Sequence, residues 1–527
     1  MKAAKVASRP LPALAGSTVL VLGLGDSGLA MARWCARAGA RVRVWDSRAE
    51  PPQAAALAAH VPTAERLPPV ALAAGDLAGV DRVLQSPGLA PHDARIAALL
   101  GAAAAAGVPV QGELDLFREA LEGLHRDAGY APRLVAVTGT NGKTTTTAMT
   151  ALLVAASGRR VAAAGNIGPT LLQTLADAID AGDAATLGER LPEVWVLELS
   201  SFQLATTSGF EADAAALLNL SEDHLDWHGS MAAYGAAKGR VFGTRATIVV
   251  NRDDAAALRL VPAPAVVAGR KGRPPRTVTR VVVSFGSDPP RAPGDWGLVV
   301  ESGMAWLVRA RDDDAPAGKG QPETAPTLQH LMPADALRVR GRHNALNALA
   351  ALALAAAIGC PLAPMLHALR DYHGEPHRVE YVASVAGVDA FDDSKGTNVG
   401  ATVAAIDGLG ADRAPARLVV ILGGDGKGQD FMPLAAPLAR HARAALTIGR
   451  DAALVERAVA AAGVAFERCA SLETAVAAAF ARAEPGDAVL LSPACASLDM
   501  FRNYGHRAQV FVAAVEALAE AAGEVPA

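Results

Sequence analysis

The fold of this chain is decided by residues 135–147, which read Val-Ala-Val-Thr-Gly-Thr-Asn-Gly-Lys-Thr-Thr-Thr-Thr. An apolar, β-branched run leads into a glycine-rich turn, and the turn ends in Gly-Lys-Thr where a helix-forming segment begins. Such a turn directs backbone N–H groups and the positive end of a helix towards an anion, so the stretch predicts a phosphate-binding loop. Lys143 would add positive charge for the outer phosphates, and the Thr144 hydroxyl can bind Mg²⁺. The usual loop has a glycine five residues before Gly142, where this chain has Val137, so the loop is a shortened form.

Length and composition limit the kind of protein. At roughly 150 residues per domain, the 527 residues predict about three domains. The net charge of −4 gives no basic excess that would indicate nucleic acid or a membrane as a partner. The four cysteines lie far apart without a CxxC pair, which predicts neither a disulfide framework nor a zinc site and favours a cytoplasmic location. We further expect a monomer.

A dinucleotide-type fingerprint lies near the N-terminus. A strand at residues 17–22 is followed by Gly23-Leu24-Gly25-Asp26-Ser27-Gly28, a helix, and a second strand that ends in Asp46. Taken alone this pattern indicates NAD, but a UDP group also presents a diphosphate to a helix N-terminus. Residues 83–88 form another strand that ends in a tight turn, and a polar segment at 123–132 places the first domain boundary near residue 120.

Two further strand ends in the central segment carry candidate chemistry. Glu198 ends an apolar strand downstream of the phosphate loop, where a further Mg²⁺ contact is expected. His224 follows the strand at 214–220, and its place in another strand-end loop of the same sheet favours a ligand or substrate role. Lys238 falls in a small-residue helix, and its sequence surroundings predict only a solvated surface lysine.

Residues 270–330 are rich in Pro, Gly, Arg and Asp. We interpret them as peripheral hairpins with a mobile loop at about residues 312–327, inserted in the central domain. After residue 369, strands at 388–391, 418–422 and 488–491 are each followed by a polar loop. Lys395 and Lys427 follow two of these strands, which predicts an anionic ligand such as a carboxylate or a phosphate.

The pattern of strands and helices therefore predicts an α/β protein with three domains. We expect a Rossmann-like N-terminal domain (1–120), a central P-loop ATPase-like domain with a mostly parallel sheet (121–368), and a C-terminal Rossmann-like α/β domain (369–527). The simplest mechanism that uses a nucleotide-phosphate loop, a diphosphate cradle and an anion site is ATP-driven ligation. A carboxylate would attack the γ-phosphate, and an amine would then displace phosphate from the acyl phosphate. Because two anions must approach each other, metal and lysine charge would supply most of the catalysis.

Five motifs resemble those of the Mur ligases of peptidoglycan synthesis, and the resemblance covers nearly the whole chain. They are residues 139–144 (Gly-Thr-Asn-Gly-Lys-Thr), 198–203 (Glu-Leu-Ser-Ser-Phe-Gln), 222–224 (Glu-Asp-His), 343–347 (His-Asn-Ala-Leu-Asn) and 377–378 (His-Arg). Three further features are similar to the branch that joins D-glutamate to UDP-N-acetylmuramoyl-L-alanine. They are the fingerprint at 23–28 with Ser-Pro-Gly at 86–88, Asp-Asp-Ser-Lys-Gly-Thr-Asn at 392–398, and Ser-Pro-Ala-Cys-Ala-Ser-Leu-Asp-Met-Phe at 492–501.

The resemblance implies ATP and two Mg²⁺ ions as cofactors, and a role for each matching residue. The residues implied in ATP binding are Gly139, Thr140, Asn141, Gly142, Lys143, Thr144, Thr145, Asn344, Arg378 and Asp393. Those implied in metal binding are Thr144, Glu198, His224 and, as a carbamate, Lys238. Those implied in catalysis are Lys143, His224, Lys238 and Lys395. Those implied in binding the UDP substrate or D-glutamate are Asp26, Ser27, Ser47, Arg48, Gly88, Asn166, Ser200, Gln203, Thr397, Lys427, Ser497 and Tyr504.

Three alternatives compete with this hypothesis. An NAD-dependent oxidoreductase would use the fingerprint and Asp46, but it leaves the phosphate loop, Glu198 and the two C-terminal lysines unexplained. Another amide ligase of the same fold is possible, either a sister Mur ligase or a folylpolyglutamate synthase. The fingerprint domain disfavours the folate enzyme, and Lys427 with Ser497 favours an acidic amino acid. A non-enzymatic nucleotide switch would have no need of a second anion cradle.

Overall fold

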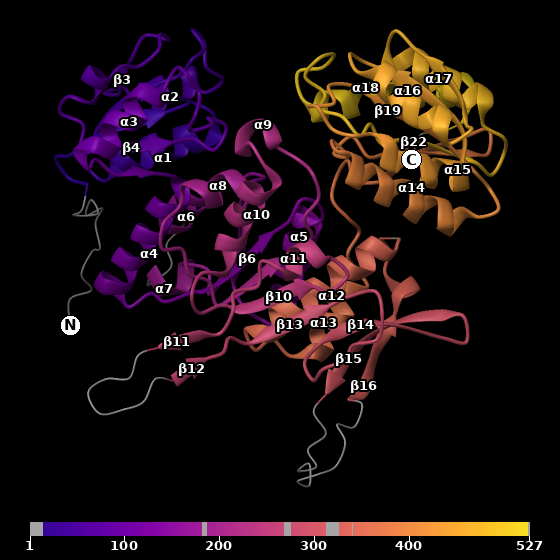
Figure 1. Ribbon diagram of the computed structural model, residues 1–527, viewed down its shortest axis with the longest axis horizontal. Coiled ribbons are helices and arrows are strands. Elements are labelled where there is room, and N and C mark those ends of the chain that lie inside the picture. Colours follow the sequence, from indigo (N-terminus) through magenta and orange to yellow (C-terminus); the bar gives the residue numbers. More distant parts are fainter. Residues whose placement is uncertain (1–13, 182–186, 268–275, 312–325, 340, 525–527) are drawn as a thin grey trace.

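The computed structural model describes residues 14–181, 187–267, 276–311, 326–339 and 341–524. Three large β-sheets, mostly parallel, define three sheet-bearing parts, so the predicted three-domain α/β class is confirmed. In Figure 1 the N-terminal part (indigo) and the C-terminal part (yellow) stand side by side above the central part. None of the described helices combines the length and the apolar composition that a membrane span requires.

The N-terminal sheet has five parallel strands in the order β3-β2-β1-β4-β5. Its elements and the helix that follows are β1 (Thr18–Leu22), α1 (Asp26–Arg37), β2 (Arg41–Trp45), α2 (Ala54–His60), β3 (Glu65–Arg66), β4 (Arg82–Gln85), α3 (Ala97–Ala106), β5 (Val110–Gln111) and α4 (Glu113–Ala128). The apolar residues of β1 are fully buried, as a strand in the middle of a parallel sheet requires. The glycine-rich turn after β1 therefore opens at the middle of this sheet's carboxyl edge.

The central sheet has nine strands in the order β16-β15-β14-β13-β10-β9-β6-β8-β7. The elements of this part are β6 (Arg133–Thr138), α5 (Lys143–Ala156), β7 (Val161–Gly165), α6 (Leu171–Asp180), α7 (Leu187–Arg190), β8 (Val194–Glu198), α8 (Ser201–Thr206), β9 (Ala214–Leu217), α9 (Leu225–His228), α10 (Met231–Gly239), β10 (Thr247–Asn251), α11 (Ala255–Leu258), β13 (Val282–Phe285), β14 (Trp296–Glu301), β15 (Met304–Arg311), β16 (Thr327–Pro333), α12 (Arg342–Ala357) and α13 (Leu362–Leu369). β6 pairs in parallel with β8 on one side and β9 on the other, so the phosphate loop leaves the sheet between them.

The interpretation of residues 270–330 as hairpins is confirmed for β14, β15 and β16, which are consecutive antiparallel strands, but these strands are part of the central sheet. β13 pairs in parallel with β10, and β14, β15 and β16 continue the same sheet. Phe285 and Trp296 are each 1% exposed and belong to the apolar core beneath α12, and their burial sets where these strands pair. The short β-like patches in the sequence do not show which strand each of them pairs with. β11 (Ala265–Val267) and β12 (Arg276–Val278) do form a separate antiparallel pair. The loop expected at 312–327 lies outside the described residues, apart from its last two positions.

The C-terminal sheet has six strands in the order β17-β18-β22-β19-β20-β21. Its elements are β17 (Glu380–Val385), β18 (Val388–Asp392), α14 (Val399–Arg413), β19 (Leu418–Gly423), α15 (Ala435–His441), β20 (Ala442–Ile448), α16 (Ala452–Ala461), β21 (Ala465–Arg468), α17 (Leu472–Arg482), β22 (Ala488–Leu491) and α18 (Tyr504–Ala521). β17 is antiparallel to β18, and the other pairs are parallel. β22 lies between β18 and β19, so the loops after these three strands meet at one edge of the sheet.

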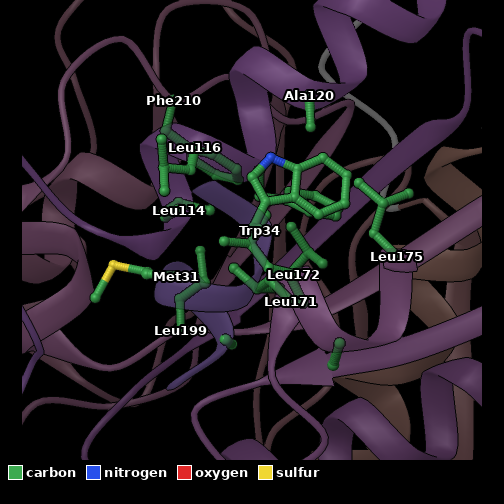
Figure 2. Packing of buried hydrophobic residues seen from close by; sticks show 14 of the residues in the cluster. Met31, Trp34, Leu114, Leu116, Ala120, Leu171, Leu172, Leu175, Leu199 and Phe210 are labelled. Atoms are coloured by element: carbon green, nitrogen blue, oxygen red, sulfur yellow. The ribbon is translucent and has the colours of Figure 1, made fainter. Parts of the chain in front are cut away.

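One apolar core is shared by the N-terminal and central parts. Figure 2 shows Trp34 of α1 beside residues of α6 and α4, including Leu172 and Ala120. The predicted first boundary at residue 120 falls inside α4, which packs against α6 of the central part. The two apolar clusters of the C-terminal part contain only residues from position 379 onwards. The N-terminal and central parts are therefore joined by apolar packing. Among the described residues, no apolar cluster includes residues of both the central and the C-terminal part.

Candidate active site

The phosphate loop connects β6 to α5 and is held from two sides. Asn219, just beyond β9, accepts a hydrogen bond from the Asn141 amide (2.8 Å) and donates one to the Asn141 carbonyl (3.0 Å). Gly142 has φ +81°, and a Cβ there would lie 2.5 Å from Oδ1 of Asn347 on α12. Both the backbone angle and the lack of space therefore require glycine at this position.

Two lysines converge beneath this loop. Lys143 Nζ donates to the carbonyl oxygens of Gly139 (3.0 Å) and Thr140 (2.8 Å). Lys238 is 1% exposed and its Nζ donates to the same Gly139 oxygen at 2.7 Å. Burial, reinforced by the charge of Lys143, lowers the pKa of Lys238 well below its ordinary value. The expectation of a solvated lysine, drawn from the surroundings of Lys238 in sequence, is thus wrong, because α10 turns this side chain into the core beside Tyr234 (4.7 Å to the ring centre).

An acid ends β8 and a histidine lies in the loop after β9, the two strands on either side of β6. Glu198, the last residue of β8, is 3% exposed and accepts a hydrogen bond from Asn166 Nδ2 at 2.9 Å. His224 precedes α9 with φ +55°, and its ring packs on Phe202 with 4.7 Å between ring centres. Burial lowers the pKa of His224 to about 4, although Asp223 opposes the shift, so its ring is neutral at physiological pH. A buried carboxylate and a neutral imidazole at one sheet edge are groups that can bind a metal.

A cavity of about 360 Å³ lies between the phosphate loop, α12 and the C-terminal part. Of the residues implied in the resemblance, those that line it are Asn141, Gly142, Thr145, Asn344, Arg378, Asp393 and Lys395. Arg378 also donates to the Thr144 hydroxyl at 2.6 Å, so the C-terminal part reaches the phosphate loop directly. Burial raises the pKa of Asp393 to about 7, and burial together with the Arg378 charge lowers the pKa of Lys395 to about 8.

Two further contacts join the central and C-terminal parts. Asn398 Nδ2 donates to Asn141 Oδ1 of the phosphate loop at 3.0 Å. Lys427 Nζ lies 3.1 Å from Asp223 Oδ1, next to His224. Polar side chains from both parts thus meet at the loop where phosphate would bind.

A second cavity, of about 610 Å³, lies at the carboxyl edge of the N-terminal sheet and faces the central part. The residues implied in substrate binding that line it are Asp26, Ser27, Ser47, Arg48, Gly88, Asn166 and Gln203. Asn166 lines this cavity and also donates to Glu198, so it connects the second cavity with the phosphate-loop region.

The acid that would mark an NAD site is already engaged. Asp46 Oδ2 accepts the Leu24 amide at 2.7 Å, and both its oxygens accept the Arg48 guanidinium at 2.8 Å. Burial alone would raise the pKa of Asp46, but these hydrogen bonds outweigh it and lower the pKa to about 2. The carboxylate orients Arg48 at the cavity wall, which weakens the argument for Asp46 as a ribose ligand.

Other implied residues lie outside both cavities. Ser200 caps α8, and its hydroxyl and amide bond to Gln203, which supports a structural role for this side chain. Tyr504 places its ring 3.9 Å from Lys395 Nζ. Ser497 is 4% exposed, and Thr397 is half-buried in the loop after β18.

Some residues at the site were not among those expected. Arg95 and Phe202 line the second cavity, and Asp223 and Asn398 make the contacts between the central and C-terminal parts. Asp223 precedes His224 at a strand end, a signal that sequence reasoning could have used. Arg95 lies ten residues beyond its strand, so nothing in the local pattern marks it.

A phosphate loop where two lysines converge beside one cavity, and a glycine-rich cradle with arginines at another, define a nucleotide-dependent enzyme of three α/β domains. Family profiles match the same three parts of the chain: a MurD-like N-terminal domain of Mur ligases at residues 17–112, the Mur ligase middle domain at 137–268, and the Mur ligase glutamate ligase domain at 377–495. The chain therefore belongs to the Mur ligase family.

Individual relatives agree with this assignment. The UDP-N-acetylmuramoylalanine–D-glutamate ligase of Ralstonia nicotianae is 55% identical over 516 residues, which cover 96% of this chain and 98% of the relative. The protein of the same name from Burkholderia mallei is 57% identical over 511 residues, covering 95% and 97%. Among solved structures, the UDP-N-acetylmuramate–alanine ligase of Thermotoga maritima is 19% identical with a TM-score of 0.54, covering 95% of this chain and 99% of that one. The MurF ligase of Thermotoga maritima in complex with ADP has a TM-score of 0.52 at 16% identity, covering 97% and 98%. Both likenesses concern the fold.

Proposed function

We infer that this protein is an ATP-dependent ligase that joins D-glutamate to UDP-N-acetylmuramoyl-L-alanine in peptidoglycan precursor synthesis. The relatives of 55% and 57% identity that carry this activity in their names support the substrates. The observation that carries the mechanism is the Asn166–Glu198 hydrogen bond, which joins the cavity of the N-terminal part to the strand end beside the phosphate loop. A substrate held in that cavity can extend its carboxylate towards the phosphate of ATP.

We propose that the UDP group binds in the second cavity and ATP in the first. Gly23–Gly28 presents a helix N-terminus to the diphosphate, and Arg48 adds a fixed positive charge. Asn344 and the phosphate-loop residues that line the 360 Å³ cavity would hold ATP. Thr397, Lys427, Ser497 and Tyr504 are proposed for D-glutamate, because they lie in or just beyond the loops that meet at the C-terminal sheet edge.

The residues present fit a Mg²⁺ requirement. Mg²⁺ prefers oxygen ligands, and Thr144 and the buried Glu198 supply a hydroxyl and a carboxylate close to the phosphate loop. We propose these two, His224 and a carbamylated Lys238 as its ligands. When bound, the metal would neutralise charge on the ATP phosphates.

The chemistry asks the chain to bring two anions together. The substrate carboxylate displaces ADP from the γ-phosphate, giving an acyl phosphate, and the amine of D-glutamate then displaces phosphate to form the amide. Lys143 and Lys395 lie where they can offset the negative charge of both anions. Closure of the C-terminal part over the phosphate loop would exclude water from the acyl phosphate.

We also propose a cytoplasmic, monomeric enzyme. All four cysteines are buried free thiols, which suits a reducing compartment. Size-exclusion chromatography with light scattering would test the monomer, and a mass near twice 53.7 kDa would contradict it.

The function is tested by phosphate release with ATP, Mg²⁺ and UDP-N-acetylmuramoyl-L-alanine, adding D-Glu, L-Glu, L-Ala, L-Lys or meso-diaminopimelate separately. Release with D-Glu alone is expected. Release with another amino acid would keep the ligase class but change the substrate, and no release with any of them would overturn the proposal.

A further inference from the structure

Arg507 is an arginine that the mechanism above does not use. It lies in the first turn of α18 and is 1% exposed, among the largest fully buried side chains of the described chain. Arginine is rarely buried so completely unless its charge is compensated. Burial lowers the pKa of Arg507 to about 10, while Asp392 and Asp499 are among the groups that oppose this shift, so the side chain remains a cation at neutral pH.

The guanidinium of Arg507 binds two backbone carbonyls from separate loops. One Nη donates to the carbonyl oxygen of Ser394 at 2.7 Å, in the loop after β18. The other donates to the carbonyl oxygen of Cys495 at 3.2 Å, in the loop after β22. β18 and β22 are adjacent parallel strands, with Asp392 opposite Leu491, so both loops leave the same sheet edge. A planar fork of N–H donors can fix the spacing of two such carbonyls, which a single ammonium cannot do equally well.

Each of these two loops carries one residue of the amino-acid site proposed above. Thr397 lies three residues after Ser394, and Ser497 lies two residues after Cys495. The two loops are in close contact, because a Cβ on Gly396 of the first loop would lie only 2.9 Å from Ser492 Oγ of the second. A change in the distance between the loops would therefore move the pocket residues rather than be absorbed locally.

We propose that Arg507 is a positioning residue for the amino-acid substrate, setting the separation between the Lys395–Thr397 loop and the Ser497 loop. The inference rests on the proposed function, since it takes Thr397 and Ser497 as part of the site of D-glutamate. Arg507 lies behind the loops and acts through their backbone, without contact with substrate.

The test uses the full-length enzyme with Arg507→Lys and Arg507→Met, assayed for phosphate release while each substrate is varied in turn. Lysine keeps the charge but loses the fork, and methionine keeps much of the stem but loses every donor. We expect both variants to raise KM for D-Glu by roughly ten- to hundredfold, as the loss of charge-assisted hydrogen bonds would. KM for ATP should rise less, because Asp393 and Lys395 on the first loop form only one side of the ATP cavity. KM for the UDP substrate should change by less than about threefold. Arg502→Lys, at an exposed arginine five residues earlier, is the matched control and should leave all three KM values unchanged.

The outcomes separate the hypotheses. Equal rises in KM for ATP and D-Glu, or variants that fail to fold, would show that Arg507 supports the whole domain and would overturn the inference. Unchanged KM for D-Glu would overturn it as well. If the wild-type enzyme itself releases no phosphate with D-Glu, the proposed function fails first, whatever the variants do.

Discussion

At the scale of single residues, burial decides which side chains can act. Lys238 is the clearest example. The small residues around it in the sequence suggest an exposed side chain, yet the side chain is buried in the core. The buried Lys238 and the half-buried Lys143 share the Gly139 carbonyl and repel each other, and Asp223 and Glu198 only partly compensate. A carbamate on Lys238 would replace this repulsion by an attraction to Lys143, which is the physical argument for the modification.

Lys238→Ala is expected to remove most activity and to regain part of it when acetate or formate is added. A small carboxylate can enter the space left by the side chain and restore the missing negative charge. Steady-state phosphate release with and without 50–200 mM added carboxylate, an order-of-magnitude range for weak anion binding, measures the rescue. Undiminished activity without any additive would show that Lys238 has no part in the reaction, and chloride at equal ionic strength is the control.

Lys143→Ala should lower kcat by roughly 100-fold or more, because it removes a positive charge aimed at the phosphates in a buried site. The variant should keep its fold, since Lys143 Nζ bonds only to its own loop among the described contacts. Circular dichroism checks the fold and phosphate release checks turnover. Full activity would contradict the phosphate-loop assignment.

At the scale of elements, the beginning of α12 combines stability with the site. His343 lies in its first turn, close to Gly408 of α14, where a Cβ would lie 3.0 Å from the imidazole Cε1. Burial lowers the pKa of His343 to about 4, and the positive end of the helix also disfavours a charged ring there.

This shift makes folding depend on pH. Between pH 6.5 and pH 4 the unfolded chain binds a proton at His343 that the folded chain does not, so the free energy of unfolding decreases as pH falls through this window. His343→Gln should make this decrease in the free energy of unfolding smaller, by on the order of 2 kcal/mol between pH 6.5 and pH 4. Urea denaturation of both proteins from pH 7.5 to 4.5 measures it, and parallel slopes would contradict the assignment. The raised pKa of Asp393 has the opposite effect, because there the folded chain binds the extra proton as pH falls. The informative quantity is therefore the difference in pH dependence between the wild-type protein and His343→Gln.

The strands added to the central sheet depend on one arginine. Arg252, after β10, donates to Asp288 Oδ1 at 2.5 Å and to the Trp296 carbonyl at 2.6 Å, and its side chain is only 12% exposed. It thus joins β10 to the β13–β14 connection and to the first residue of β14.

Arg252→Ala should lower the free energy of unfolding by about 2–4 kcal/mol, because Asp288 loses its more buried arginine and the Trp296 carbonyl loses a donor. Arg291 also binds Asp288, but its side chain is 81% exposed. Arg291→Ala should therefore change the free energy of unfolding by less than about 0.5 kcal/mol. Thermal denaturation compares the two, and equal effects would mean that the burial of Arg252 is unimportant.

At the scale of the whole molecule, the three parts are not joined alike. The N-terminal and central parts share an apolar core (Figure 2), so separating them would expose side chains such as Trp34 and Leu172. The central and C-terminal parts meet through hydrogen bonds and an ion pair, for example Arg378 with Thr144 and Lys427 with Asp223. Polar contacts of this kind exchange with water at little cost, which permits movement.

We therefore expect nucleotide and UDP substrate together to close the C-terminal part onto the central part while the first two parts move as one body. Small-angle scattering should show a smaller radius of gyration on adding both ligands. Distances between spin labels should shorten between the central and C-terminal parts and stay constant between the first two. Unchanged scattering, or a changed distance between the first two parts, would count against this behaviour.

The sequence by itself determined the α/β class, the phosphate loop and the strand-end positions of Glu198 and His224. These features are local, because a strand, a glycine turn and a helix start are encoded within about ten residues of one another. Only the tertiary structure decided the burial of Lys238, the extension of the central sheet by β13–β16, the shared core of the first two parts, and the fork from Arg507 to two loops. Each of these depends on segments that are distant in the chain, and burial and pairing between such segments leave no period or spacing in the sequence.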